Sequence, residues 1–133
     1  TSGTGHCKDY PCLSLEELLK VSDIVSIHAP LNERTNRLIG KEQLALMKPT
    51  AYLVNVGRGA IIVEEDLAEA VDNGIIAGAG IDVFVQEPIP EDHPYLKMQH
   101  PERMRLTPHI AWASIEARRR LIDIMADNIR KGW

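Results

Sequence analysis

The sequence has few aromatic residues, only two cysteines and no excess of positive charge. Phenylalanine, tryptophan and tyrosine make up 5% of its 133 residues, which argues against an aromatic surface that stacks nucleic-acid bases. Two cysteines are too few for a disulfide-stabilised secreted fold. The formal net charge of -4 leaves no basic stripe for nucleic acid or an anionic membrane. No apolar run approaches the ~20 residues that cross a bilayer, so neither nucleic acid nor a membrane is expected as a partner.

The first residues carry no targeting signal. They include no initiator methionine, no charged leader region and no apolar one, so a cytoplasmic location is expected. A glycine-rich opening, Thr1 to Gly5, that runs directly into regular sequence suggests a piece of a longer polypeptide. Cys7 and Cys12 have no second ligand pair nearby, so free thiols are expected and no metal site.

What the sequence does contain is an alternation of short apolar runs with amphipathic stretches. Hydrophobic residues make up 44% of the chain, enough for one globular core. Strands alternating with helices predict an α/β fold with a parallel sheet. The predicted strands cover 23–28, 51–56, 75–83 and 104–107, the helices cover 15–21, 41–47, 64–73 and 113–129, and 85–98 is predicted as an irregular loop. Glycines 78 and 80 in the third strand are expected to let a helix or a ligand approach closely.

Each predicted strand is followed by polar, glycine or proline residues. Because the carboxyl ends of parallel strands share one edge of the sheet, and ligands bind outside that edge, these residues are expected to converge on a site. They are His28-Ala29-Pro30, Asn55-Val56-Gly57-Arg58-Gly59, Asp82 and Thr107-Pro108-His109.

Arg58 lies between two glycines directly after an apolar strand. Its guanidinium could bind a carboxylate through two parallel hydrogen bonds, which a lysine could not do. The glycines would free the backbone to turn and to approach a ligand. The alternative is a surface arginine in a turn, and the spacing favours neither.

His109 and Glu87 are candidates for proton transfer. Histidine is the side chain most easily tuned to exchange a proton near neutral pH, although a lone histidine at a strand end is more often packed or capping. Glu87 in a proline-rich loop is by default a solvated carboxylate. If the fold brings the two together, the carboxylate would favour the protonated imidazole.

The remaining polar candidates are weaker. Asp82 could cap the turn that follows it or hydrogen-bond a ligand amide. His28 at a strand end stays ambiguous, and surface solvation is expected for His6, His93 and His100.

Taken together, these segments resemble the NAD-dependent D-isomer-specific 2-hydroxyacid dehydrogenases. The similar segments, in family order and spacing, are 14–19, 23–31, 46–49, 53–59, 78–83 and 107–111. The run from His109 to Ser114 is most similar to the glycerate dehydrogenase (hydroxypyruvate reductase) branch. The resemblance implies a Rossmann-like, doubly wound parallel sheet in a three-layer α/β/α arrangement, a small 2-keto or 2-hydroxy acid as substrate, and a homodimeric parent protein.

The resemblance also implies a role for each matching residue. Arg58 would bind the substrate carboxylate, His109 would be the proton donor in reduction, and Glu87 would hydrogen-bond His109. Asp82 would contact the nicotinamide end of the cofactor. Other residues implied to lie along the dinucleotide are Ala29, Pro30, Thr35, Val56 and Gly57, together with Arg58 and His109.

Some parts of the family pattern are absent. The Gly-x-Gly-x-x-Gly turn that holds the pyrophosphate does not occur, nor do the strand-end acid that contacts the adenosine ribose and the substrate domain. Without that acid, the sequence does not show a preference between NAD and NADP. The resemblance implies NAD as the cofactor, with NADP not excluded. Residues 1–133 are expected to form a partial NAD-binding domain that is inactive alone, and a half-sheet with an exposed edge and an apolar helix face is expected to self-associate. Two alternatives remain: a non-catalytic NAD(H)-sensing module like the corepressors of this superfamily, and a dimerisation remnant.

Overall fold

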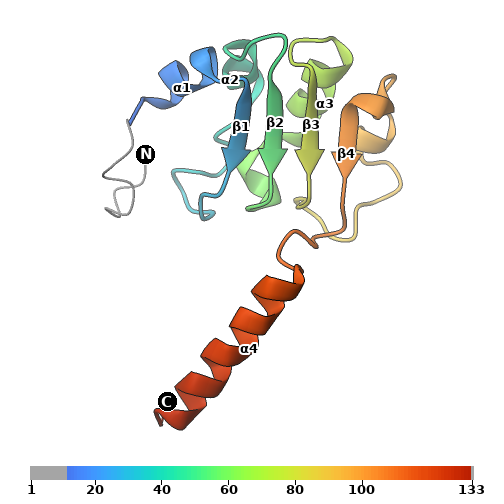
Figure 1. The fold of residues 1–133 in the computed structure, drawn as a ribbon. Helices are drawn as coiled ribbons and strands as arrows, with labels where there is room; N and C mark the ends of the chain where they lie inside the picture. Colours follow the sequence, from blue (N-terminus) through green and yellow to red (C-terminus); the bar gives the residue numbers. More distant parts are fainter. Residues whose placement is uncertain (1–11, 133) are drawn as a thin grey trace.

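The centre of the molecule is a sheet of four parallel strands, seen in a computed structural model that describes residues 12–132. Neighbouring strands pair in chain order, β1-β2-β3-β4 (Figure 1). In register, Ile27 pairs with Asn55, and Asn55 with Ile81. The strands are β1 (Ile24–Ile27), β2 (Tyr52–Asn55), β3 (Gly78–Ile81) and β4 (Met104–Leu106). The predicted parallel α/β fold is confirmed.

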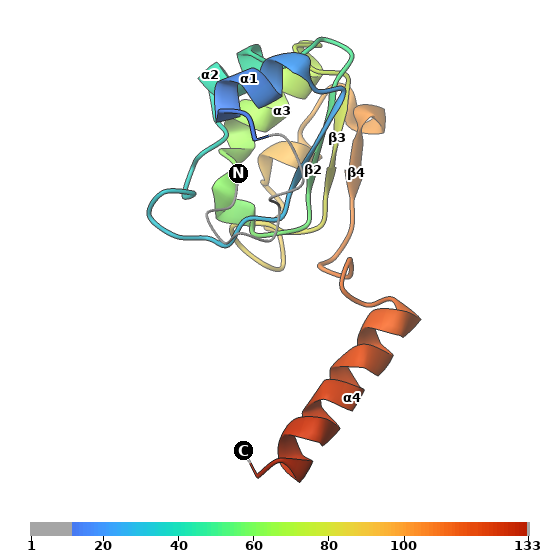
Figure 2. The same cartoon turned by 60° about the vertical axis from the view of Figure 1, so that its left-hand side comes forward.

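Three helices cover one face of this sheet (Figure 2): α1 (Leu15–Val21), α2 (Lys41–Ala45) and α3 (Glu64–Asp72). Helix α1 begins with the predicted capping box, in which Ser14 and Glu17 hydrogen-bond each other's backbone. Leu19, Leu44 and Leu67 from the three helices are fully buried. On the opposite face, Ile24 and Tyr52 are exposed, so residues 12–132 contain no second layer of helices over this sheet.

The third strand is shorter than the sequence predicted. Helix α3 is terminated by Gly74, which follows its last turn and has a left-handed φ of +68°. The N–H groups of Gly74 and Ile75 donate to the carbonyls of Val71 and Ala70. This is a Schellman motif, which uses the backbone of Ile75 to end the helix instead of starting the strand. At Gly78 the expected close approach is made by backbone: an added Cβ would lie 2.4 Å from the Arg103 carbonyl oxygen.

The segment after β3 is more ordered than a loop. It contains two short 3-10 helices, η2 (Pro94–Leu96) and η3 (Pro101–Arg103). His93, predicted to be solvated, is only 4% exposed, so that prediction is wrong. Its ring packs between those of Phe84 and Tyr95, with centroids 5.8 and 4.8 Å away. His100 is half-exposed, as expected, whereas His6 and Cys7 lie outside the described residues.

Helix α4 (Ile115–Arg130) points away from the sheet (Figures 1 and 2) and contains no buried residue. Its large apolar side chains, including Leu121, Ile122 and Met125, are about half exposed or more, as the sequence predicted for an unpartnered helix face. No helix within residues 12–132 has the length and apolar character needed to cross a membrane. The same residues contain no cluster of three or more histidine, cysteine, aspartate or glutamate side chains that could hold a metal ion.

Candidate active site

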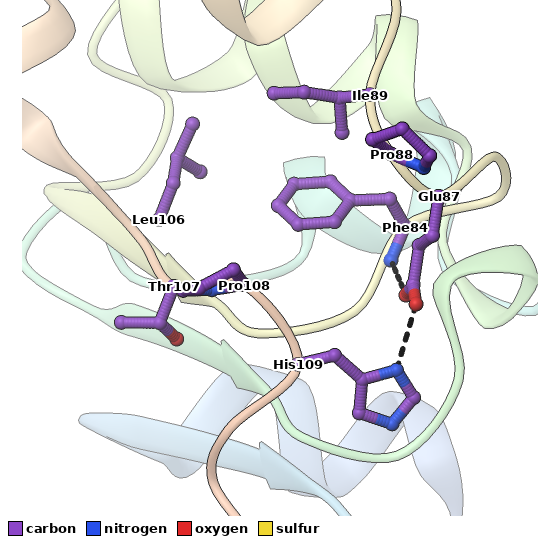
Figure 3. Close-up of a pocket in the computed structure, with 8 residues that line it drawn as sticks. All are labelled: Phe84, Glu87, Pro88, Ile89, Leu106, Thr107, Pro108 and His109. Carbon is purple, nitrogen blue, oxygen red and sulfur yellow. Dashed lines mark hydrogen bonds and ion pairs between the residues drawn. The ribbon is translucent and has the colours of Figure 1, made fainter.

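Glu87 and His109 come together at the carboxyl edge of the sheet. His109 Nδ1 lies 2.8 Å from Glu87 Oε2 (Figure 3). Glu87 comes from the loop after β3 and His109 from the loop after β4, so the parallel topology makes the contact that the sequence left open. Both side chains stay accessible, 41% exposed for His109 and 36% for Glu87.

The protonation of this pair follows from its hydrogen bonds. Glu87 Oε1 accepts the Phe84 N–H at 2.9 Å. This bond, followed by the bond from His109, lowers the pKa of the Glu87 carboxyl. An ionised carboxylate can only accept, so His109 Nδ1 carries the proton in this contact. The other ring nitrogen, Nε2, points away from Glu87 (Figure 3) and is available to a ligand.

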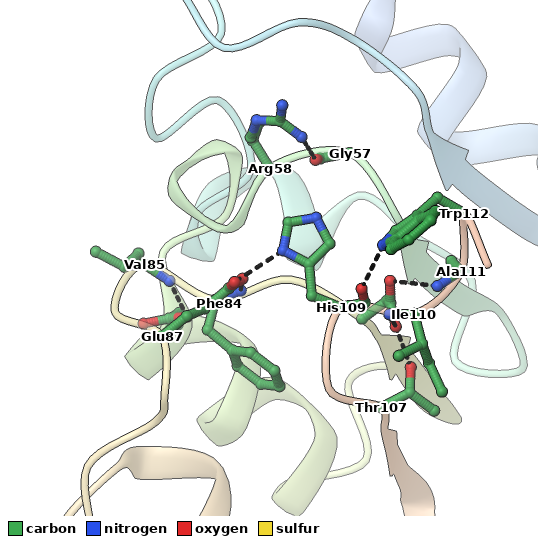
Figure 4. Close-up of polar contacts among 12 residues, drawn as sticks. Gly57, Arg58, Phe84, Val85, Glu87, Thr107, His109, Ile110, Ala111 and Trp112 are labelled. Atoms are coloured by element: carbon green, nitrogen blue, oxygen red, sulfur yellow. Dashed lines mark hydrogen bonds and ion pairs between the residues drawn. The ribbon is translucent and has the colours of Figure 1, made fainter. Parts of the chain in front are cut away.

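The backbone of His109 adopts an unusual conformation, with φ at +55°. Residues other than glycine rarely occupy this left-handed region, and they are held there by surrounding bonds. Here the His109 N–H donates to the Asp82 carbonyl at 2.8 Å, and Trp112 Nε1–H donates to the His109 carbonyl at 2.9 Å (Figure 4). The loop therefore presents the imidazole in a fixed direction.

Asp82 holds the same loop through its side chain. Its carboxylate accepts hydrogen bonds from the Thr107 hydroxyl at 2.5 Å and from the N–H groups of Ile110 and Ala111 at 2.9 and 2.8 Å. Burial alone would raise the pKa of Asp82, but these bonds outweigh it and lower the pKa. Asp82 was expected to cap the turn that follows it or to bind a ligand amide; its side chain instead holds the loop after β4, far along the chain.

Arg58 lies at the same edge, at the end of β2 (Figure 4). Its side chain is exposed and donates to the Gly57 carbonyl at 2.8 Å. The turn is held by Asn55, which is 1% exposed and bonds both the Gly57 N–H and the Arg58 carbonyl at 3.0 Å. Sequence reasoning placed Asn55 at the end of the strand but gave it no role, although an amide that ends an apolar strand is a signal of a buried polar group that must find partners.

Both glycines beside Arg58 allow close packing of backbone on backbone. A Cβ on Gly59 would lie 2.0 Å from the Phe84 carbonyl carbon, and one on Gly57 would lie 3.3 Å from the Ala29 carbonyl oxygen. The expected close approach to the glycine backbone occurs, but it is made by the backbone of neighbouring loops and not by a ligand. As a result, the Arg58 turn rests directly on the segment that carries Glu87.

Two hollows flank these side chains. One, of about 470 Å³, lies at the ends of β1 and β2 and is lined by His28, Ala29, Pro30, Leu31, Val56, Gly57 and Arg58. The other, of about 440 Å³, lies beside the Glu87–His109 pair (Figure 3) and is largely apolar, with Phe84, Ile89, Leu106 and Pro108 among its lining residues. Both volumes are typical of small-molecule sites.

The first hollow fits part of a dinucleotide. Five of the residues expected along the cofactor line it, in an open groove at the carboxyl edge where such cofactors bind in α/β sheets. Thr35 does not line it; its hydroxyl donates to the Pro30 carbonyl at 2.7 Å and so holds the loop that does.

The parallel sheet, with polar side chains gathered at its carboxyl edge, is that of a Rossmann-like, dinucleotide-binding domain. Residues 3–111 match the family model of the D-isomer specific 2-hydroxyacid dehydrogenase, NAD binding domain. The chain belongs to this family.

Named relatives agree with this assignment. A glyoxylate reductase of Korarchaeum cryptofilum is 51% identical over 115 residues, which cover 86% of this chain and 34% of the relative. A glycerate dehydrogenase of Methylorubrum extorquens is 43% identical over 117 residues, covering 88% and 37%. The chain thus spans about a third of the length of the relatives it matches.

Solved structures show the same fold. A D-lactate dehydrogenase from Aquifex aeolicus, complexed with NAD and lactic acid, matches with a TM-score of 0.76 and 30% identity, over 89% of this chain and 39% of that one. The acyclic imino acid reductase Bsp5, in complex with NADPH and D-Arg, matches with a TM-score of 0.85 and 33% identity, over 98% and 40%.

Proposed function

We propose that residues 1–133 form part of the nucleotide-binding domain of a longer D-2-hydroxyacid dehydrogenase, whose glycine-rich half and substrate domain lie outside this sequence. The reaction is the reduction of a small 2-keto acid, such as hydroxypyruvate, to the D-2-hydroxy acid, such as glycerate, and its reverse. The observation that carries the proposal is the 2.8 Å contact between Glu87 and His109 beside an open hollow. The names of the relatives support the class of substrate.

In this proposal each side chain has a defined task. The Arg58 guanidinium binds the substrate carboxylate through two hydrogen bonds and aligns the keto group. His109 Nε2–H protonates the keto oxygen, and in the reverse direction the neutral ring accepts the hydroxyl proton. Glu87 holds His109 Nδ1–H and stabilises the positive charge of the protonated ring. A nicotinamide cofactor held at this edge would supply the hydride for the keto carbon, so that one hydride and the proton from His109 would convert the ketone into the alcohol.

Binding of the cofactor is proposed to involve both loops of the larger hollow. Ala29, Pro30, Val56 and Gly57 lie along the dinucleotide, and Thr35 supports the first loop. Asp82 is assigned the nicotinamide end, where its Oδ2 accepts a single hydrogen bond and so keeps acceptor capacity. NAD is the proposed cofactor, and NADPH is tested beside it because the imino acid reductase was solved with NADPH. For the whole protein we also propose a homodimer and a cytoplasmic location, as the family resemblance implies.

Two measurements test this function. First, the 133-residue chain is titrated with NADH and with NADPH while nicotinamide fluorescence is followed. Second, the complete polypeptide is assayed for oxidation of NADH by hydroxypyruvate and by glyoxylate. Turnover by the complete polypeptide, with none by the 133-residue chain, is the expected result. NADH binding without turnover by the complete polypeptide would contradict the enzyme and favour the non-catalytic, NAD(H)-sensing alternative.

A further inference from the structure

A second glutamate–histidine pair, Glu64 and His93, is buried in the molecule. His93 Nε2 is 3.2 Å from Glu64 Oε2, and the two side chains are only 3% and 12% exposed. Glu64 is the first residue of α3 and His93 precedes η2. Neither residue takes part in the proposed reaction.

The position of the proton on His93 follows from its surroundings. The Tyr95 N–H donates to His93 Nδ1 at 3.3 Å, so a neutral His93 carries its proton on Nε2, facing Glu64. That nitrogen has no hydrogen-bond partner of good geometry among residues 12–132, although the carboxylate is within ion-pair distance. A buried polar group with incomplete hydrogen bonding lowers the stability of the fold, so its presence here needs an explanation.

The buried pair is linked to the exposed pair through one stretch of backbone. Glu64 Oε1 accepts the Val85 N–H at 3.0 Å. Glu87 Oε1 accepts the adjacent Phe84 N–H at 2.9 Å (Figure 3). The His93 ring stands edge-on to the Phe84 ring at 88°. Two carboxylates therefore hold the Phe84–Val85 backbone on which the Glu87 side chain is anchored, and the imidazole packs against the Phe84 ring.

Only a carboxylate can present an acceptor to both neighbours of Glu64. The Val85 N–H and the His93 Nε2–H are both donors, and an ionised carboxylate has two oxygens that only accept. A glutamine of the same shape would accept from one neighbour and turn its NH₂ group toward the other. The charge also suits the amino end of α3, where the helix dipole favours an anion.

We propose that Glu64 and His93 are positioning residues for the Glu87–His109 pair: Glu64 fixes the Phe84–Val85 backbone, and His93 fixes Glu64. The proposal rests on the function proposed above for Glu87 and His109. It differs from a stabilising role alone, because it requires that changes at Glu64 alter the state of His109.

The test compares Glu64→Gln with Glu65→Gln, which removes the same charge from an exposed neighbour in the first turn of α3. The first readout is the rate at which diethyl pyrocarbonate modifies His109 at neutral pH, measured by mass spectrometry on the 133-residue chain. The reagent attacks an unprotonated ring nitrogen, and Glu87 holds the proton at Nδ1, so displacing Glu87 changes this rate. Glu64→Gln is expected to change it in the same direction as Glu87→Gln and by a similar factor, while Glu65→Gln leaves it at the level of the unaltered chain.

The second readout is steady-state kinetics of the complete polypeptide. Glu64→Gln is expected to lower kcat by about 10- to 100-fold, as for a misplaced catalytic group, with the KM for NADH within about twofold of the unaltered enzyme. His93→Gln should lower kcat in the same way, and the double variant should be no worse than the stronger single one, because both act through one backbone segment. Glu64→Asp, too short to reach both donors, replaces Glu64→Gln if circular dichroism shows that the latter does not fold.

An unchanged modification rate at His109, together with a lowered melting temperature in Glu64→Gln, would overturn the positioning role and leave a structural one. Absence of turnover by the unaltered complete polypeptide would instead refute the proposed function. The modification experiment does not use turnover, so the two failures are distinguishable.

Discussion

The two glutamate–histidine pairs of this molecule use the same residue types in opposite ways. In the Glu87–His109 pair the side chains are 36% and 41% exposed, one ring nitrogen is bound by the carboxylate, and the other is free. In the Glu64–His93 pair the side chains are 12% and 3% exposed, and both ring nitrogens face protein atoms. The chemistry of histidine therefore depends on what its second nitrogen can reach, and the presence of a carboxylate partner alone does not identify a proton-transfer site.

A third pair gives this comparison its control. His100 Nδ1 lies 3.1 Å from Glu102 Oε1, at 45% and 64% exposure. It precedes β4, whereas His109 follows that strand, so it lies away from the carboxyl edge where the other loops converge. Exposure and a carboxylate partner are thus also insufficient without the edge of the sheet.

The largest expected effect comes from replacing the ring of the exposed pair. His109→Ala in the complete polypeptide removes the proton donor and should lower kcat by about 10²- to 10⁴-fold. His100→Ala, which removes the ring of the third pair, should leave kcat unchanged. Stopped-flow and steady-state oxidation of NADH measure both variants, and equal losses in the two would end the distinction between the pairs.

Arg58→Lys tests the anion contact beside the exposed pair. A lysine keeps the charge but cannot make the two parallel hydrogen bonds of a guanidinium. Loss of one bond to a charged group is worth about 1.5–3 kcal/mol, so the KM for the keto acid should rise by about 10- to 100-fold. A KM for the keto acid equal to that of the unaltered enzyme would remove Arg58 from the substrate site.

Gly59→Ala disturbs the backbone that both pairs share. The added Cβ would lie 2.0 Å from the Phe84 carbonyl carbon, and this neighbour is backbone that cannot rotate away. The free energy of unfolding should fall by about 1–3 kcal/mol, as for other overpacked sites. Urea unfolding of the 133-residue chain measures the change, and a variant as stable as the unaltered chain would show that the Phe84–Val85 segment is not held tightly.

The smallest expected effect is the dependence of stability on acid. The pKa values of Asp82 and Glu87 are lowered in the fold, so below the ordinary carboxyl pKa the unfolded chain binds more protons than the folded one. The stabilisation from these groups is complete above their unfolded pKa values, near 4, and is lost as the pH falls through the lowered ones. The urea concentration at the unfolding midpoint should fall as the pH is lowered from 7 to 5, 4 and 3. It should fall less steeply in Glu87→Gln. An equally steep decline in that variant would contradict the role of Glu87.

Much of the fold could be predicted because its signals are local. The capping box at Ser14, the glycine after α3 and the alternation of apolar runs each depend on neighbouring residues. The start of β3 was placed too early because Ile75 looks like a strand residue, yet its N–H closes the end of a helix.

The site could be predicted only where the topology brings strand ends together. That rule placed Arg58, Asp82 and His109 at one edge. Glu87 was a candidate only if the fold brought it to His109, and the resemblance implied that it does. The burial of His93 depends on a contact with α3, far along the chain, whereas the role of Asn55 depends on the geometry of a tight turn. A histidine in a proline-rich stretch gives no local sign of such burial.

The central claim is that the exposed pair transfers the substrate proton. Its most direct test is the pH dependence of kcat for the complete polypeptide, measured in both directions. Reduction requires the protonated His109 ring and oxidation the neutral one, so as the pH rises the rate of reduction should fall and the rate of oxidation should rise. Parallel profiles for reduction and oxidation would contradict the account.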